Sequence, residues 1–290
     1  MTAVPFWHQP LQARRSRRRY STPVNADPLD GYGGQVDWRR RHWSRTNFFE
    51  AWRLLAEGAP GYESLQFDGI LVVNSKLPTP LFNVAFVRRP LLDAERSIDR
   101  AIHHFQASGV PGLITFPPGL DPDAEAVARD RGFDTAPPHP GMVLHPIGDL
   151  GETPRDLEIR NVRDEKELGA FLDAAEAGFG SSTPRALAGN QLVSHPAVEL
   201  FVGYVDGVAA TTSALITTGR VAGIYWVSTL KPYRGSGLGE ALTAHAIRAG
   251  QARGCDTATL RASAMGRPIY ERMGFSLSDD FISYIIPGPR

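Results

Sequence analysis

The chain has 290 residues, 42% hydrophobic and 21% charged, and it carries no net charge at pH 7. This describes a globular protein of one large or two ordinary domains, and neutrality excludes a global attraction to nucleic acid or acidic membranes. Cys255 is the only cysteine, which excludes an intrachain disulfide, and no apolar run approaches the ~18 residues of a membrane span. We therefore predict a cytoplasmic protein without a secretory signal.

The N-terminal 45 residues form a basic segment with nine arginines, three aspartates and no glutamate. Its densest part runs from Arg14 to Arg19. Proline and glycine are frequent and no apolar period is visible, so residues 1–45 are predicted to be a solvated, partly disordered arm. Contact between this arm and nucleic acid or another anionic surface is the alternative that composition disfavours.

Apolar patterning divides residues 46–150 into alternating strands and helices. The predicted elements are a helix with Thr46 as its N-cap, strands at 65–73 and 81–87, a helix at 93–107, a strand at 112–116, a helix at 121–131 and a strand at 142–147. That last strand is expected to close the first unit. The polar stretch Asp149–Asp156, with Gly151 and Pro154, is the predicted boundary.

The second half repeats this alternation. Its predicted elements are a strand at 157–162, helices at 165–178 and 184–193, strands at 200–205, 208–217 and 222–230, a helix ending near Arg253, a strand at 257–262, a helix at 266–273 and a strand at 281–286. Asp206-Gly207 is a strong hairpin signal between two of the strands. Cys255, between a helix and a strand, is predicted to be a small core residue.

A shift of 145 residues aligns the two halves. Arg89 then falls on Arg234, Glu95 on Glu240 and Gly109 on Gly254, and after a three-residue slip Gly132-Phe133 falls on Gly274-Phe275. The matches keep their order and their strand-helix-strand-helix context, which favours a duplicated unit over chance.

The strand at 222–230 leads into a glycine-rich loop, Arg234-Gly235-Ser236-Gly237-Leu238-Gly239, and then directly into a helix. The free N–H groups and the dipole of a helix N-terminus attract anions, and glycines let the backbone approach a pyrophosphate closely. Leu238 is expected to face the core. A plain strand-to-helix turn is the alternative, since the dinucleotide and P-loop fingerprints are both missing from this loop.

Two longer segments carry a family resemblance. Val221–Gly239 (VAGIYWVSTLKPYRGSGLG) resembles the fourth strand and motif A of GCN5-related N-acetyltransferases, and Leu260–Phe275 (LRASAMGRPIYERMGF) resembles motif B. The resemblance covers about residues 157–286. It implies an α/β fold of two tandem acetyltransferase-like domains, each a mixed, mostly antiparallel sheet flanked by helices, and it implies transfer of an acyl group from acetyl-CoA to an amine.

The resemblance also implies site residues. Backbone groups of the strand would pair with pantetheine and the loop would cradle the pyrophosphate, which gives the cofactor-binding set Val227, Ser228, Thr229, Arg234, Gly235, Ser236, Gly237, Leu238 and Gly239. Ser263 stands where many members have an asparagine near pantetheine. Tyr270 matches the frequent general acid, and a phenol is a competent donor to a departing thiolate. A core aromatic is the alternative reading of Tyr270.

No general base is assigned, because the strand Ile224–Thr229 carries no carboxylate where many members keep one. His195, Glu199 and Asp206 are near in sequence but are better explained as surface or turn residues, and a water chain could serve instead. Tyr225 and Trp226 either shape the acceptor pocket or pack in the core. Residues 176–196 and the first half are expected to supply that pocket.

In the first half, the aligned loop Arg89–Glu95 replaces the glycines by Pro90, Leu92 and Ala94 and places Asp93 beside any phosphate. We predict residues 46–150 to be a degenerate copy and residues 151–290 to be the catalytic domain, with no metal. The expected acceptor is a small-molecule primary amine, with neither a membrane nor a nucleic acid as partner and the oligomeric state left open. The alternatives are a non-catalytic acyl-CoA sensor or scaffold and a tandem transferase resembling mycothiol synthase.

Overall fold

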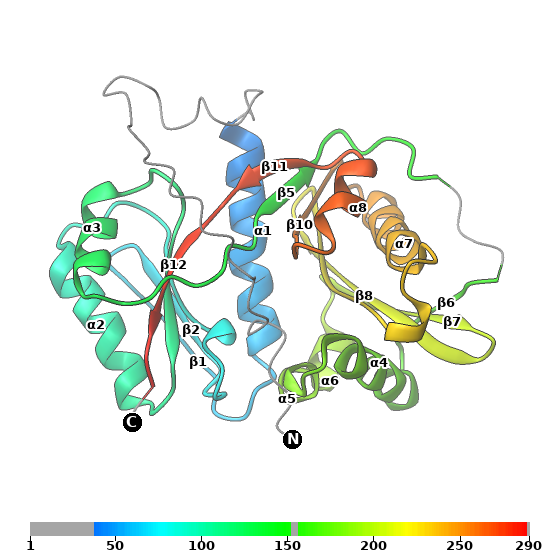
Figure 1. Cartoon of the computed structure of the whole chain (residues 1–290), viewed down its shortest axis with the longest axis horizontal. Coiled ribbons are helices and arrows are strands. Elements are labelled where there is room, and N and C mark those ends of the chain that lie inside the picture. Colours follow the sequence, from blue (N-terminus) through cyan, green and yellow to red (C-terminus); the bar gives the residue numbers. More distant parts are fainter. Residues whose placement is uncertain (1–37, 152–155, 289–290) are drawn as a thin grey trace, which may run out of the picture.

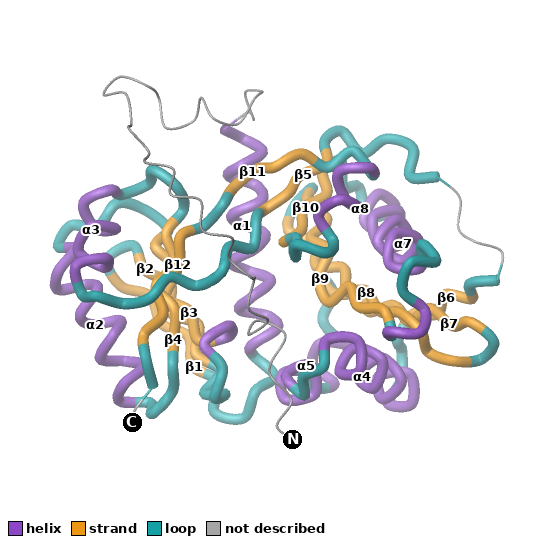
Figure 2. Tube along the Cα trace, in the orientation of Figure 1, coloured by secondary structure: helices purple, strands orange, loops and turns teal. Residues whose placement is uncertain are grey.

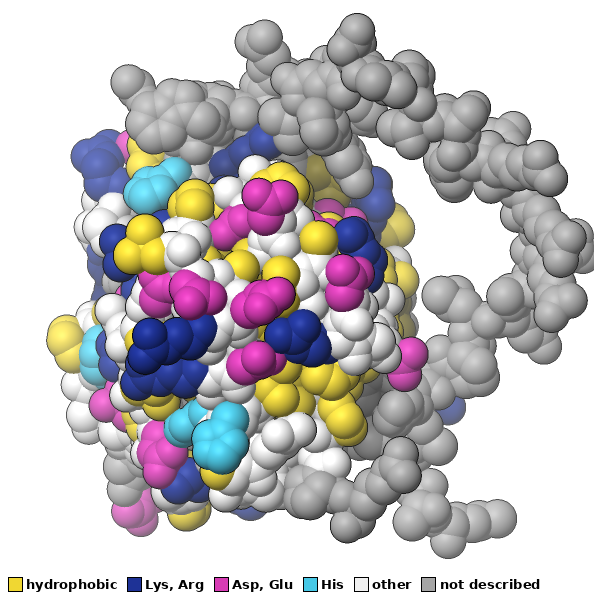
Figure 3. Space-filling view, turned by 90° about the vertical axis from the view of Figure 1, so that its left-hand side faces the viewer, with side chains coloured by type: hydrophobic (Ala, Val, Ile, Leu, Met, Phe, Trp, Pro, Cys, Tyr) yellow, Lys and Arg dark blue, Asp and Glu magenta, His cyan; other side chains and the backbone are white. Residues whose placement is uncertain are grey.

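The computed structural model describes residues 38–151 and 156–288. Two β-sheets stand on either side of a long helix, α1 (Trp38–Ala56), as Figure 1 shows. The remaining helices cover the outer face of each sheet and one end of the space between the sheets (Figure 2). On the outer face of the first half, basic, acidic and hydrophobic side chains are interspersed (Figure 3).

The first sheet has the strand order β1-β2-β3-β4-β12. Its strands are β1 (Glu63–Phe67), β2 (Ile70–Asn74), β3 (Asn83–Val87), β4 (Gly112–Phe116) and β12 (Ile282–Ile286). Only β3 and β4 pair in parallel, and α2 (Ala94–Ala107) makes the crossover between them. Helix α3 (Pro122–Asp130) follows β4. A parallel pair needs such a crossover, because the end of the first strand and the start of the second lie at opposite ends of the sheet.

The second sheet has the order β11-β5-β10-β9-β8-β7-β6. Its strands are β5 (Gly141–Leu144), β6 (Glu158–Asn161), β7 (Val198–Val205), β8 (Val208–Thr218), β9 (Val221–Thr229), β10 (Thr257–Arg261) and β11 (Ser276–Asp279). Again one pair, β9 and β10, is parallel, and α7 (Leu238–Ala252) connects it. Helix α8 (Arg267–Arg272) follows β10, while α4 (Glu165–Phe179), α5 (Thr183–Leu187) and α6 (Asn190–Ser194) precede β7.

The two halves exchange one strand each. Strand β5, expected to close the first unit, instead pairs with β10 and β11 in the second sheet. Strand β12, the last in the chain, pairs with β4 in the first sheet. That expectation for residues 142–147 was therefore wrong. Strands that follow one another in the chain usually pair, but a strand can instead pair with any sheet edge that is left open in the folded protein. The sheets do not divide at residue 150.

Helix α1 begins earlier than predicted. It starts at Trp38, so residues 38–45, assigned to the arm, are helical, and Thr46 lies inside the helix instead of capping it. Tertiary contacts hold this part: Ser44 Oγ lies 2.7 Å from Thr259 Oγ1, and Arg45 forms a 2.9 Å ion pair with Asp279. A helix face held by polar contacts leaves no apolar period in the sequence. The rest of the predicted arm, residues 1–37, lies outside the described residues.

Smaller differences have local causes. The predicted strand 65–73 is a hairpin, because Asp68 and Gly69 both adopt positive φ and turn the chain. The predicted helix 184–193 is two short helices, α5 and α6. Strand β11 was not predicted. The Asp206-Gly207 hairpin is confirmed, with φ of 50° and 77°.

The repeat has a structural counterpart. Each sheet contains an antiparallel hairpin followed by a strand, a crossover helix, a parallel strand and a second helix. The aligned glycines Gly109 and Gly254 both adopt positive φ, as do Gly132 and Gly274. These are the positions after helices where only glycine is unstrained.

One hydrophobic core joins the two halves. It contains Leu55 of α1, Phe86 of the first sheet, Leu200 and Ile216 of the second sheet, and Phe171 of α4. Two further large cores lie on the outer faces, under α2 and α3 and under α7 and α8, and a smaller fourth cluster contains Leu238. Cys255 is buried, as predicted, and burial raises the pKa of its thiol. Within the described ranges, no helix is both long and apolar enough to cross a bilayer.

Candidate functional site

Strands β9 and β10 pair at only one end. Their register runs from Val221 opposite Thr257 to Ile224 opposite Leu260 and then stops, although β9 continues to Thr229. One edge of Tyr225–Thr229 is therefore left without a neighbouring strand. An open strand edge presents N–H and C=O groups that an extended ligand can pair with. The predicted pantetheine partners Val227, Ser228 and Thr229 all lie on this edge.

A bulge in β9 lies at the start of the open edge. Ala214 pairs with Tyr225 and Thr212 with Ser228, so Trp226 and Val227 together stand opposite Ser213. Trp226 adopts φ of 48°, an unusual conformation for a bulky residue. Strain of about 1–3 kcal/mol per such residue is tolerated where surrounding structure fixes it, commonly at functional sites.

The bulge turns two aromatic side chains to one face. The Tyr225 hydroxyl donates to Asn47 Oδ1 of α1 at 2.6 Å, and the Trp226 ring lies 5.9 Å from Phe171 of α4. Val227, by contrast, faces α7, where it lies next to Gly239. Core packing accounts for Tyr225, which is buried and whose pKa is raised by that burial. Trp226 is half-buried at the open edge.

The glycine loop leads directly into α7. Gly235 and Gly237 adopt φ of 81° and 80°, and space is open where their Cβ atoms would lie. Within the described residues, no side chain caps the N-terminus of α7. Leu238 is buried, as predicted, and anchors the loop in the core. The loop therefore offers unblocked N–H groups at the positive end of a 15-residue helix.

The Arg234 side chain donates to two backbone carbonyls. Its Nε donates to the Thr229 carbonyl at 3.0 Å, and one terminal nitrogen donates to the Gly178 carbonyl at 2.8 Å. These bonds fasten the loop to the end of β9 and to α4. Ser236 also bonds within the loop, donating to the Tyr233 carbonyl at 2.6 Å. The side chains thus shape the loop, while the backbone remains open to a ligand.

Ser263 and Tyr270 meet beside the open end of β10. A Cβ on Gly266 would lie 3.0 Å from the Tyr270 ring and 3.4 Å from Ser263 Oγ, so Gly266 makes room for both. Ser263 Oγ accepts the Gly266 N–H at 3.1 Å, in the turn that precedes α8. Burial raises the pKa of Tyr270 to about 12, with a hydrogen bond to Thr243 acting in the opposite direction. The phenol is therefore protonated at neutral pH.

The matching loop of the first half is filled by the chain itself. The Leu91 N–H donates to Asp121 Oδ2 at 2.8 Å, and the Leu92 and Asp93 N–H groups donate to the Asp68 carboxylate at 3.2 and 3.3 Å. Asp93 also caps α2. Internal carboxylates hold the positions that a phosphate would need, so this loop is closed to an anionic ligand.

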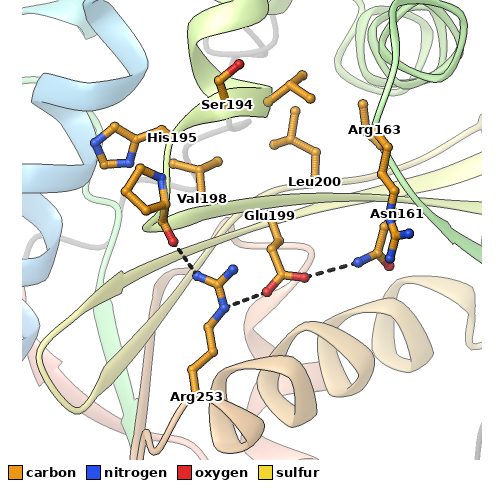
Figure 4. Close-up of a pocket in the computed structure, with 11 residues that line it drawn as sticks. Asn161, Arg163, Ser194, His195, Val198, Glu199, Leu200 and Arg253 are labelled. Carbon is orange, nitrogen blue, oxygen red and sulfur yellow. Dashed lines mark hydrogen bonds and ion pairs between the residues drawn. The ribbon is translucent and has the colours of Figure 1, made fainter.

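A cavity of about 340 Å³ lies elsewhere, between α6, β7 and the C-terminal end of α7 (Figure 4). It contains two of the residues considered as bases. Glu199 forms an ion pair with Arg253 at 2.7 Å and accepts from Asn161 at 3.1 Å, while His195 Nδ1 accepts the Ala197 N–H. Because α7 is roughly 20 Å long at ~1.5 Å per residue, this end is remote from the loop at its N-terminus. Asp206 is a turn residue, as expected.

The site also contains features that sequence reasoning missed. No local sequence pattern predicts the bulge at Trp226, because a bulky residue is not expected to adopt positive φ. The turn at Asp68-Gly69 could have been anticipated, since it is the same hairpin signal as Asp206-Gly207, but the bonds from the loop to the Asp68 carboxylate have no local signal.

Comparison with known proteins agrees with this geometry. Residues 196–277 match the family model of the acetyltransferase (GNAT) domain. These residues are a GNAT domain. The match covers β7 to β10, the glycine loop, Ser263 and Tyr270. A search of the curated proteins found no match to the chain.

Solved structures share the fold over most of the chain. A GCN5-related N-acetyltransferase from Kribbella flavida has a TM-score of 0.67 at 17% identity, over 85% of this chain and 96% of its own. A functionally unknown conserved protein from Staphylococcus epidermidis scores 0.60 at 15%, over 79% and 95%. A tandem GNAT protein from the clavulanic acid biosynthesis pathway scores 0.53 at 14%, over 85% and 96%. These identities show the fold alone, and they confirm the predicted fold class.

Proposed function

We propose that the protein transfers an acetyl group from acetyl-CoA to a primary amine of a small molecule. The observation that carries the proposal is the uncapped N-terminus of α7, approached by Gly235 and Gly237 and lying beside the open edge of β9. The pyrophosphate fits the loop because nothing fills the space beyond the two glycines. Pantetheine would extend along Val227, Ser228 and Thr229 toward Ser263.

In this arrangement acetyl-CoA supplies the activated acyl group, and the chain supplies position and proton transfer. Ser236, Leu238 and Gly239 complete the cradle around Gly235 and Gly237. A backbone N–H of β9 would stabilise the oxyanion. Tyr270 would protonate the departing sulfur. A phenol with a pKa of about 12 is a weaker acid than free tyrosine, so Tyr270 acts as a hydrogen-bond donor to the developing thiolate more than as a full acid.

We further propose that the first half is a degenerate copy without a donor site. Asp68 and Asp121 occupy the N–H groups that would otherwise bind a phosphate. The first half then serves the second through α1, whose Asn47 and Trp52 contact Tyr225. The face shared by Tyr225 and Trp226 would receive the acceptor amine.

The donor site is tested by comparing Gly237→Glu with Gly254→Glu. Both glycines have positive φ, both side chains would enter open space, and they lie at opposite ends of α7. The backbone cost is therefore matched, and only Gly237→Glu places a carboxylate in the cradle. We expect isothermal titration to show loss of acetyl-CoA binding in Gly237→Glu alone. Equal affinity in both variants would refute this position of the cradle.

Catalysis is tested separately by release of free thiol from acetyl-CoA in the presence of a panel of primary amines. Turnover that Gly237→Glu abolishes and Gly254→Glu retains supports the proposed reaction. If acetyl-CoA binds tightly and no amine of the panel releases thiol, the chain is a sensor or scaffold and not an enzyme.

A further inference from the structure

Aromatic side chains from both halves line the face expected to receive the acceptor. Tyr225 and Trp226 turn to this face at the bulge of β9. Trp52 reaches it from α1, where its ring meets that of Tyr225 edge to face at a centroid distance of 6.0 Å. Phe171 of α4 lies 5.9 Å from Trp226. These four residues form an aromatic surface at the start of the open edge of β9.

Two of these rings keep exposed surface. Trp52 and Trp226 are half-buried, whereas Tyr225 between them is buried. The orientation of Trp52 is fixed, because its indole N–H donates to the Leu81 carbonyl at 2.7 Å and its ring stacks on that of Phe82 at a centroid distance of 5.1 Å. Ring surface that stays open on a side chain held in one orientation is preorganised for a ligand.

The backbone at Trp226 would suit a smaller residue better. Its φ of 48° is a conformation that glycine or asparagine adopts with less strain than a bulky side chain. Contact with Phe171 accounts for only part of the ring, since Trp226 is half-buried. A large ring held at a strained position with part of its surface open is expected to have a role beyond packing.

Donor and acceptor would reach the gap between β9 and β10 from opposite faces of the sheet. The side chain of Val227 faces α7 and lies next to Gly239, so the glycine loop belongs to that face. Tyr225, which bonds to Asn47 of α1, and Trp226 belong to the other face. An amine must approach the thioester carbonyl from a side that acetyl-CoA does not occupy. The aromatic surface lies on that side.

The open edge offers rings and not charges for recognition of an acceptor. Residues Tyr225–Thr229 include no carboxylate, lysine or arginine. Aromatic rings prefer offset-stacked or edge-to-face partners, and such pairs contribute binding free energy beyond the apolar area that they bury. A saturated ring of equal carbon number buries similar area but lacks this contribution. The surface therefore favours a flat aromatic ring.

We propose that the acceptor is an amine carried by an aromatic ring, and that Trp52 and Trp226 determine this specificity by contact with the ring. The inference rests on the proposed acetyl transfer. The ring of the acceptor lies on the aromatic surface and its amino group extends into the gap between β9 and β10. The neutral nitrogen forms a bond to the acyl carbon, and the C–S bond breaks with its electron pair on sulfur. The amide keeps one N–H, and the proton that nitrogen loses goes to sulfur.

The test compares 2-phenylethylamine with 2-cyclohexylethylamine, which share the amino group, the linker and the carbon number of the ring. We expect kcat/KM to be about tenfold higher for the aromatic amine, mainly through a lower KM. Trp226→Leu keeps the backbone strain and removes the ring, so it should abolish the preference while isothermal titration shows unchanged acetyl-CoA affinity. Trp43→Leu is the matched control and should keep the preference, because Trp43 is also half-buried but packs against His145.

A second variant covers a failure of Trp226→Leu to fold. Asparagine tolerates positive φ, so Trp226→Asn relieves strain and should lose the preference in the same way. Equal kcat/KM for the two amines, a preference for the cyclohexyl compound, or an aromatic preference that survives in both Trp226 variants would overturn the inference. Turnover without a ring preference leaves acetyl transfer intact and refutes this inference alone. If the unaltered protein binds acetyl-CoA and acetylates no primary amine, the proposed function fails and this inference with it.

Discussion

At the scale of single residues, the site depends on positions where the backbone is unusual. Gly235 and Gly237 need positive φ to enter α7, and glycine adopts it freely. Trp226 adopts positive φ at a cost, held by the Thr212 hydroxyl, which donates to its carbonyl at 2.8 Å. The residues nearest the proposed reaction are thus fixed by their surroundings.

Tyr270→Phe tests the proton donor. The ring is buried against Phe275 and Gly266, so phenylalanine should fold and bind acetyl-CoA as tyrosine does. We expect kcat to fall by about 100-fold or more if the hydroxyl assists the departing sulfur. Tyr284→Phe, a buried tyrosine of the first sheet, is the control. An unchanged kcat in Tyr270→Phe would make Tyr270 a core aromatic.

The same residue should influence stability at high pH. The folded pKa of Tyr270, about 12, lies above the ordinary value of about 10 in an unfolded chain. Its contribution is therefore complete below pH 10 and is lost as pH rises through the folded pKa. Tyr270→Phe should show a shallower fall in the free energy of unfolding between pH 10 and 12, measured with urea. Parallel curves for the two proteins would contradict this.

At the scale of elements, the two crossover helices show how one motif can be open or closed. Helix α2 begins with Asp93 capping its first turn and with Asp68 and Asp121 on the preceding N–H groups. Helix α7 begins with Gly237, without a side-chain cap among the described residues. An open helix end keeps its positive potential for a ligand, while a capped one uses it for stability.

Substitutions of Arg234 test whether its side chain fixes the conformation of the glycine loop or binds the phosphates through its charge. Its two bonds come from two nitrogens of the planar guanidinium and reach carbonyls of β9 and α4, a spacing that the single nitrogen of lysine does not reproduce. We expect Arg234→Lys and Arg234→Ala to weaken acetyl-CoA binding alike, by about tenfold for ~1.4 kcal/mol of lost loop order, measured by isothermal titration. If lysine retains the affinity and alanine does not, Arg234 acts through charge on the phosphates instead.

At the scale of the whole molecule, the exchanged strands make each half depend on the other. The second sheet needs β5 from residues 141–144, and the first needs β12 from residues 282–286. The shared core between the sheets includes side chains of both halves and of α1. Such burial should couple the halves into one cooperative unit.

Calorimetry tests this coupling. We expect a single transition whose van't Hoff enthalpy equals the calorimetric enthalpy. Ending the chain after Asp280 removes β12, so the first sheet would lose its edge beside β4 and the transition should broaden or disappear. As a control, Ser283→Ala keeps the strand and removes only one side-chain contact, that with Thr115. Two well-separated transitions in the full chain would mean that the halves fold independently.

Much of this protein follows from its sequence. Periodicity placed β4 and most helices to within a few residues. The glycine loop and motif B identified the acetyltransferase fold, because both are patterns of residues close together in the chain that the local backbone conformation requires. The acetyl-CoA contacts, the acceptor and a cytoplasmic location stay predictions. Tertiary structure alone decided the rest. It exchanged β5 and β12, extended α1 through polar contacts, turned Arg234 onto backbone carbonyls and brought Trp52 to Tyr225. These depend on residues far apart in the chain, whose pairing is determined by which edges and buried polar groups remain open once the sheets have formed.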